Sequence, residues 1–310
     1  MEMVMMLMNY LILLVMVLIS VAFVTLMEQK ILAGAQIRVG PNYTGMWGLL
    51  QPFADAVKLL SKEGVSTRFS SLKIYYLSPV TMLSMSLLMW VSYTFEKGGV
   101  DLVYSVLFFM CLSGLMVYPI LTSGWSSNCK YSMLGSLRAV AQMVSYEVSM
   151  AMVLLSLVWL SGSFTFYNLV ESQYLLWNIF LYMPLGYIWF VSSLAETNRS
   201  PYDFAEGESE LVSGFNTEYG SGGFTLIFMS EYSSILFMGF LFSVLFLSSV
   251  VNVMVMFKSV AVVFCFVWVR GTLPRYRYDK LMGLAWKSFL PITLLMFSYH
   301  LSMSEMSIIY

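Results

Sequence analysis

The sequence contains few of the residues that build soluble surfaces and metal sites. Only 11% of its 310 residues are charged, less than half of the share usual in a soluble domain, and 59% are hydrophobic. Its only imidazole and thiol ligands for a metal cofactor are a single histidine, His300, and three cysteines far apart in the chain, Cys111, Cys129 and Cys265. A haem held by two imidazoles needs two histidines, and a zinc or iron–sulfur site needs about four such ligands. The composition therefore excludes a water-soluble globule and predicts that the chain itself holds no redox metal.

Neither sign of charge is in excess, because 16 Lys and Arg residues face 17 Asp and Glu residues. A protein that binds nucleic acid needs basic residues to neutralise phosphates. The glycine patterns GxGxxG and GxxxxGK that cradle nucleotide phosphates are missing as well. The lone histidine lies near the C-terminus, away from the polar loops, so a Ser–His–Asp triad is not expected. We expect neither a nucleic-acid partner, nor a nucleotide site, nor hydrolase chemistry.

Long apolar runs fill most of the chain. A helix that crosses a hydrocarbon core of ~30 Å needs ~20 mainly apolar residues. The sequence therefore predicts an all-α integral membrane protein with about eight transmembrane helices, and no linker or repeat divides residues 1–310 into more than a single transmembrane domain. The first run has neither a basic leader nor a cleavage site, which favours a span over a signal peptide. The predicted spans lie near residues 3–27, 75–95, 102–122, 140–160, 174–195, 224–250, 253–269 and 288–308.

Basic residues are distributed unequally between the two sides of these spans. Fourteen of the 16 Lys and Arg residues fall in or beside the odd-numbered loops. Because cytoplasmic or matrix loops carry the excess of Lys and Arg, these loops are predicted to face the inner side. With an even number of spans, both termini then lie on the opposite side.

The loop after the first span contains a helical pattern of its own. Apolar residues recur at helical spacing over about a dozen positions, and charged residues occupy the opposite stripe. The apolar stripe consists of Leu49, Leu50, Phe53, Val57 and Leu60, and the charged stripe of Asp55, Lys58 and Lys62. Such charges prevent the segment from crossing the bilayer, so the pattern predicts an interfacial amphipathic helix. An ordinary amphipathic connector is the alternative.

The loop at residues 194–211 is the most acidic segment of the chain. Its carboxylates are Glu196, Asp203, Glu206, Glu208 and Glu210, and Arg199 is the only cation among them. In a low-dielectric environment, desolvation and mutual repulsion would both raise the pKa values of these groups, so that they could share protons near neutral pH. The alternative is an acidic loop that is simply solvated.

Carboxylates also occur inside the apolar runs, where each costs several kcal/mol unless it faces a polar interior. Glu147 lies within the fourth predicted span and Glu231 near the start of the sixth, while Glu28 and Glu196 close the first and the fifth. Intramembrane acids usually mark ion or proton pathways. We therefore predict a hydrated polar route from the acidic loop into the bilayer. Structural ion pairs with Arg138 or Arg199 are the alternative.

Residues 194–219, LAETNRSPYDFAEGESELVSGFNTEY, closely resemble the most characteristic segment of the NADH dehydrogenase subunit 1 family, the quinone-site membrane subunits of respiratory complex I. Four more segments are similar to that family: 36–42 (QIRVGPN), 48–58 (GLLQPFADAVK), 135–147 (GSLRAVAQMVSYE) and 274–282 (PRYRYDKLM). The chain departs from the family at Gln29 and Val39, where a basic residue is usual.

The resemblance implies a core membrane subunit of a proton-translocating NADH:ubiquinone reductase in the mitochondrial inner membrane, with both termini on the intermembrane-space side. Ubiquinone would be its substrate, while FMN, NADH and iron–sulfur clusters would belong to partner subunits. The implied partners are hydrophilic quinone-module subunits, adjacent small membrane subunits, antiporter-like subunits and membrane lipids. A stand-alone cation or proton transporter, and a structural anchor for a peripheral enzyme such as a membrane-bound hydrogenase, are the alternatives.

The resemblance also implies two sets of functional residues. The quinone cavity would be lined or shaped by Gln36, Arg38, Asp55, Arg199, Asp203, Glu206, Phe224 and Arg275. The acidic route that couples this cavity to proton translocation would contain Glu147, Glu196, Glu206, Glu208, Glu210 and Glu231. This second set consists of the carboxylates that stand out in the acidic loop and the apolar runs.

Overall fold

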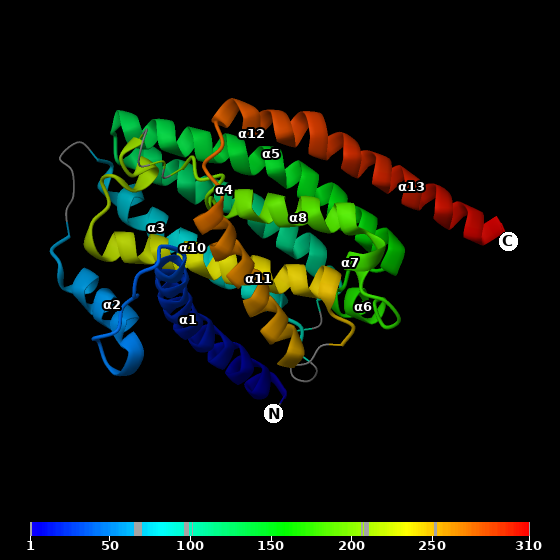
Figure 1. Ribbon diagram of the computed structural model, residues 1–310, viewed down its shortest axis with the longest axis horizontal. Helices are drawn as coiled ribbons and strands as arrows, with labels where there is room; N and C mark the ends of the chain where they lie inside the picture. Colours follow the sequence, from blue (N-terminus) through cyan, green and yellow to red (C-terminus); the bar gives the residue numbers. More distant parts are fainter. Residues whose placement is uncertain are drawn as a thin grey trace.

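The regular structure of the chain is helical. The computed structural model describes residues 2–64, 70–95, 99–100, 102–205, 207, 211–250 and 253–309, and none of these residues forms a strand. Within this part of the chain, seven helices are long and apolar enough to cross a membrane. The predicted all-α membrane fold is confirmed, and Figure 1 shows how these helices lie against one another.

Seven of the predicted spans coincide with these long helices. Three of the helices continue directly into a short 3-10 or π-helical segment, which is named here with its helix. The seven are α1 (Glu2–Ala35), α3 (Leu72–Met89) with η2 (Trp90–Ser92), α4 (Ser105–Ser126), α5 (Lys130–Ser161), α10 (Ser221–Phe242) with η4 (Ser243–Leu247), α11 (Val253–Thr272), and α12 (Tyr278–Leu284) with η5 (Ala285–Phe289) and α13 (Leu290–Ile309).

The remaining predicted span, residues 174–195, has a different structure. It contains the four-residue helix α7 (Asn178–Leu181) and the 14-residue helix α8 (Met183–Glu196), which follow the short helix α6 (Phe166–Glu171). Tyr182 between them is not helical, and Pro184 in the first turn of α8 has no N–H group with which to continue α7. At 1.5 Å per residue α8 is about 21 Å long, less than the thickness of a hydrocarbon core. The helix predicted from the apolar run is therefore longer than the helix that forms.

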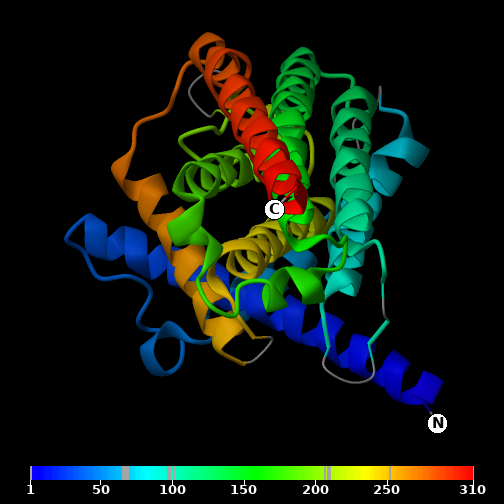
Figure 2. The same ribbon diagram turned by 90° about the vertical axis from the view of Figure 1, so that its right-hand side faces the viewer.

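The helix α10 lies at the centre of the bundle. Within its most apolar window 78% of the residues are buried, against 22% in α1 and in the last span. It packs against α3 on one side and α11 on the other, while α5 packs against α4, α8 and α13 (Figures 1 and 2). Gly239 allows the close approach of α11, because a Cβ atom there would lie 2.7 Å from Val263 Cγ2 and 3.1 Å from the Ser259 carbonyl oxygen.

The predicted amphipathic helix is present as α2 (Gln51–Ser61), which has Pro52 in its first turn. Its apolar residues Phe53, Val57 and Leu60 are exposed. The ring of Phe53 contacts Phe23 of α1, with the two centroids 6.2 Å apart. The helix thus lies beside α1 with an uncovered apolar face, outside the bundle (Figure 1).

Most of the charged loops meet at one end of the bundle, which we call the loop end. It comprises residues 36–50, 127–129, 197–205, 211–220 and 273–277. Hydrogen bonds hold these segments to the helix ends. Tyr75 Oη donates to the Glu218 carbonyl oxygen (2.6 Å), and the Tyr75 ring stacks on Tyr219 at 4.3 Å. Ser132 Oγ donates to the Phe215 carbonyl oxygen (3.2 Å). The C-terminal part of the acidic loop is therefore fixed to α3 and α5.

Replacement of Gly239 by valine should separate α10 from α11, because the added atoms overlap Val263 and the Ser259 carbonyl. Overpacking of this kind costs about 1–3 kcal/mol, so the thermal midpoint of the assembled protein should fall. Gly222→Ala in the same helix is the control, since nothing lies within 4 Å of a Cβ at that position. Equal thermal midpoints for the two variants would contradict this account of the contact.

Candidate functional site

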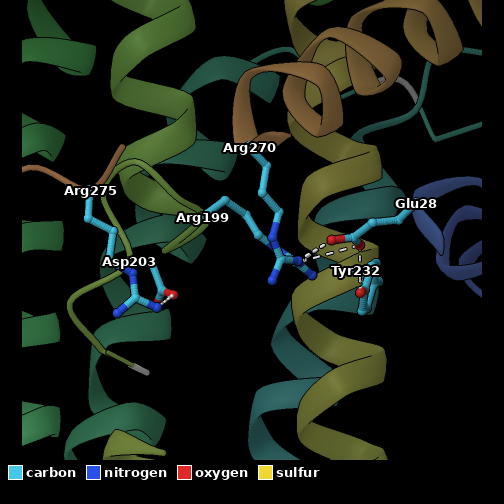
Figure 3. A network of polar contacts seen from close by, with 6 residues as sticks. All are labelled: Glu28, Arg199, Asp203, Tyr232, Arg270 and Arg275. Atoms are coloured by element: carbon cyan, nitrogen blue, oxygen red, sulfur yellow. Dashed lines mark hydrogen bonds and ion pairs between the residues drawn. The ribbon is translucent and has the colours of Figure 1, made fainter. Parts of the chain in front are cut away.

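The buried carboxylate of Glu28 is the centre of a polar network at the loop end. Glu28 is 5% exposed. Arg199 Nη1 donates to its Oε1 and Oε2 at 3.2 and 3.4 Å, and Tyr232 Oη donates to Oε2 at 2.7 Å. Arg270 Nη1 forms a second ion pair with Oε1. Figure 3 shows the two guanidinium groups reaching the carboxylate from different elements.

Four separate elements supply this network. Glu28 lies near the end of α1, Arg199 in the loop after α8, Tyr232 in α10 and Arg270 in the last turn of α11. The guanidinium carbon of Arg199 is also 4.3 Å from the centroid of the Tyr232 ring, a cation–π distance. The network therefore ties the last turns of α1 and α11, the middle of α10 and the loop after α8 together.

Two guanidinium groups surround the Glu28 carboxylate, and the charge of Glu231 also acts on Arg199. Burial lowers the pKa of Arg199, but Tyr232 and the carboxylates of Glu28 and Glu231 outweigh this effect and raise that pKa above its ordinary value. Arg199 therefore stays charged. Its Nη2 group is buried and has no hydrogen-bond partner among the described residues. The network thus combines a charged guanidinium group with an unused donor, which suits an electron-rich acceptor.

A second ion pair joins two predicted site residues. Arg275 Nη2 lies 3.0 Å from Asp203 Oδ2, and the Asp203 side chain is 12% exposed. The backbone N–H of Tyr276 donates to the Pro201 carbonyl oxygen (3.1 Å), so the segment before α12 is attached to the acidic loop. Beside this ion pair is a pocket of about 310 Å³ whose basic lining residues are Arg138, Arg275 and Arg277.

Two predicted relay carboxylates, Glu196 and Glu231, line a small internal cavity of about 30 Å³. One buried water needs ~10–15 Å³ of such space, so the cavity has room for about two waters. Glu196 is 7% exposed, and its Oε2 has no partner among the described residues, nor has Asn198 Oδ1 beside it. Much of the remaining wall is thioether, supplied by Met82, Met89, Met116, Met143 and Met238.

Glu147, a third predicted relay carboxylate, lies half-buried between α5 and α4. Gly114 of α4 leaves room for it, because a Cβ atom at that position would be 2.9 Å from Glu147 Oε1. The charges of Glu147 and Glu196 are close enough to interact. Glu147, Glu196 and Glu231 are therefore gathered around the helices α4, α5, α8 and α10.

Other predicted residues lie apart from these clusters. Gln36 and Arg38 are exposed, and Arg38 Nε donates to Gln36 Oε1 (2.9 Å). Asp55 in α2 accepts a hydrogen bond from Gln51 Nε2 (2.8 Å). Phe224 in the first turn of α10 contacts Phe228, with ring centroids 4.3 Å apart. Glu206, Glu208 and Glu210 lie outside the described residues.

Sequence reasoning left Tyr232 and Arg270 out of both functional sets and used Glu28 only as an acid at the end of a span. The structural alternative, an ion pair between an intramembrane acid and Arg199, is correct for Glu28. Arg270 could have been found by its position, because a cation in the last turn of an apolar helix ends at the same depth as Glu28. The solvated-loop alternative fails for Glu196 and Asp203, since both carboxylates are largely buried.

No group of three or more His, Cys, Asp and Glu side chains suited to a metal ion occurs in the part of the chain that the structure describes. The three cysteines are all free thiols.

Comparison with known proteins identifies the family. A family model described as NADH dehydrogenase matches residues 8–301. The chain belongs to this family. Its relatives include three proteins named NADH-ubiquinone oxidoreductase chain 1. That of Locusta migratoria is 53% identical over 299 residues (96% of this chain and 95% of the relative), that of Aedes aegypti 52% over 285 residues (92% and 91%), and that of Priodontes maximus 49% over 310 residues (97% and 98%).

The chain is therefore a subunit of NADH-ubiquinone oxidoreductase, respiratory complex I, as the resemblance implied. The other subunits of this complex are the partners of the chain. The alternative of a transporter that works alone is thereby set aside.

Glu28→Gln should destabilise the subunit, because two guanidinium groups lose the charge that compensates them. Removal of one partner from a buried pair costs about 3–5 kcal/mol. We expect a lower thermal midpoint and less assembled complex on native gels. Asp279→Asn is the control, because Asp279 and its partner Arg277 are 71% and 79% exposed in their side chains. A Glu28→Gln protein as stable as this control would show that the network contributes little.

Proposed function

We propose that this subunit forms much of the ubiquinone cavity of complex I, and that its internal carboxylates carry the proton relay that couples quinone reduction to translocation. The observation that carries the proposal is Arg199 Nη2, a buried donor of a charged guanidinium group that has no hydrogen-bond partner among the described residues. The carbonyl oxygens of a quinone accept hydrogen bonds and become more negative on reduction. A fixed cationic donor stabilises this developing charge.

The proposed cavity extends from the network towards the exposed part of the loop end. The pair Asp203–Arg275 would form its mouth beside the hydrophilic partner subunits, which hold the electron donors. Its apolar approach would run between α1, α2 and the start of α10, where Phe23, Phe53 and Phe224 lie. Gln36, Arg38, Asp55 and Glu206 complete the proposed set on the strength of the family resemblance.

The proposed relay starts beside this cavity and enters the bundle. Glu196 and Glu231 share a cavity with room for about two waters, and Glu147 interacts with Glu196 from the side of α4. Glu208 and Glu210 belong to the same proposal through the acidic loop. Moving one charge across 100 mV costs about 2.3 kcal/mol, so the relay must hold its protons in a medium of low dielectric. The burial of Glu196 and the partial burial of Glu147 and Glu231 support such a medium.

We further propose that the protein lies in the mitochondrial inner membrane as one transmembrane domain, with both termini on the intermembrane-space side. The distribution of basic residues and the names of the relatives support this placement. The loop end then faces the matrix and the hydrophilic partners.

Arg199→Gln tests the cavity. A charge-assisted hydrogen bond contributes about 1.5–3 kcal/mol, so its loss should raise the KM for ubiquinone at least about tenfold. Oxidation of NADH by an artificial acceptor that needs no quinone should not change, which controls for assembly. Arg277→Gln is the matched control, because this arginine is exposed and pairs only with Asp279 among the described residues. An unchanged KM in Arg199→Gln would argue against a quinone cavity at this network.

Glu196→Gln tests the relay. The amide keeps the size of the side chain but cannot carry a proton as a carboxyl group does, so proton translocation per NADH should drop severalfold in reconstituted vesicles. The control is Glu171→Gln, since Glu171 is exposed at the end of α6. Normal translocation and normal quinone reduction in Glu196→Gln would exclude this carboxylate from the relay.

A further inference from the structure

Gln142 of α5 is completely buried and uses one amide group to hold two backbone positions. Its Nε2 donates to the Ala195 carbonyl oxygen and to the Tyr202 carbonyl oxygen, both at 2.8 Å. Both donors of the amide are therefore used. Ala195 lies in the last turn of α8, and Tyr202 lies beyond the turn that follows it.

The two carbonyl groups bracket the segment that presents Arg199. Within this segment the Arg199 N–H donates to the Leu194 carbonyl oxygen (3.2 Å), and the Tyr202 N–H donates to the Arg199 carbonyl oxygen (2.8 Å). Asn198 has a positive φ of 49°. The chain thus reverses direction around Arg199, and the amide of Gln142 ties the two sides of this reversal together.

We propose that Gln142 is a positioning residue for the quinone site. By holding both sides of the turn, it fixes the backbone from which the Arg199 guanidinium reaches Glu28 and leaves Nη2 free. The inference rests on the proposed quinone cavity, because it assigns Gln142 a role that acts through Arg199. Among the described residues, the Gln142 side chain donates its hydrogen bonds to the Ala195 and Tyr202 carbonyl oxygens and not to Glu28, Tyr232 or Arg270.

The chemistry of this position favours an amide. A Met side chain has nearly the same length but offers no donor, and a Glu side chain would turn acceptor oxygens towards two carbonyl oxygens. An Asn keeps both donors but is one methylene shorter. The buried Gln142 Oε1 has no partner among the described residues, so the side chain is held by its donors alone.

The chain contains a matched control for these bonds. Gln173, between α6 and α7, is also completely buried, and its Nε2 donates to the Leu169 carbonyl oxygen (3.1 Å) and the Val244 carbonyl oxygen (2.8 Å). It thus donates the same pair of hydrogen bonds, but to α6 and η4, and its Oε1 also accepts one from the Asn178 N–H (3.5 Å). Gln142→Met and Gln173→Met therefore both remove two donated hydrogen bonds, from two different places in the bundle.

The experiment is a double-mutant cycle in the assembled complex with a short-chain ubiquinone. Gln142→Met should raise the KM for quinone about tenfold, which corresponds to about 1.4 kcal/mol, and leave kcat within about twofold. Gln173→Met should lower the thermal midpoint without changing this KM. In the Arg199→Gln background, Gln142→Met should change the KM less than about twofold, because the residue through which it acts is gone.

The outcomes separate the inference from the function on which it rests. If Arg199→Gln leaves the KM unchanged, the proposed cavity is wrong. If Arg199→Gln raises the KM and Gln142→Met raises it by the same factor in both backgrounds, Gln142 acts independently and the inference is overturned. It is also overturned if Gln142→Met behaves like Gln173→Met. Should Gln142→Met not assemble, Gln142→Asn is used in the same cycle, with the same supporting and opposing results.

Discussion

The arrangement of the elements around Glu28 depends on how the negative charge of this buried carboxylate is compensated. Glu28 lies near the end of an apolar helix of 34 residues, at a depth where an unpaired charge is costly. Arg199, Arg270 and Tyr232 compensate it from three other elements. Because all of these side chains contact the same carboxylate, the ends of α1 and α11, the middle of α10 and the acidic loop are held in one arrangement. A displacement of any one of these elements therefore alters the contacts of the others.

The acidic loop is also held in place by side chains and backbone groups from several elements. Its first part is held by Gln142, by the Arg199–Glu28 ion pair and by Tyr276, and its last part by Tyr75 and Ser132. These anchors come from helices, and in the case of Tyr276 from a loop, that are far apart in sequence. A segment rich in like charges resists being packed, so its position relies on neutral donors from the bundle more than on attraction within the loop. Family membership adds that this loop belongs to an oxidoreductase.

The sequence predicted the fold from apolar length alone, and this worked for seven of the eight spans because their length is fixed by the bilayer. It failed at residues 174–195, where a proline and a non-helical tyrosine shorten the helix without reducing the apolar content.

In the site, the sequence alone is enough to identify acids inside apolar runs, because the free-energy cost of a charge there depends only on its apolar neighbours along the chain. Tyr232 and Arg270 were missed because their role appears only when α10 and α11 lie beside α1. The two carbonyls held by Gln142 are separated from it by 53 and 60 residues, a relation that no local pattern contains.

The wall between Glu196 and Glu231 has a mechanical consequence. Five of its side chains are methionines, which are unbranched and have three rotatable bonds each. The volume available to water there is therefore not fixed by the backbone, as it would be beside valine or isoleucine. Rotation of one or two thioether groups changes the shape and volume of the space beside the two acids. This change requires no movement of a helix axis.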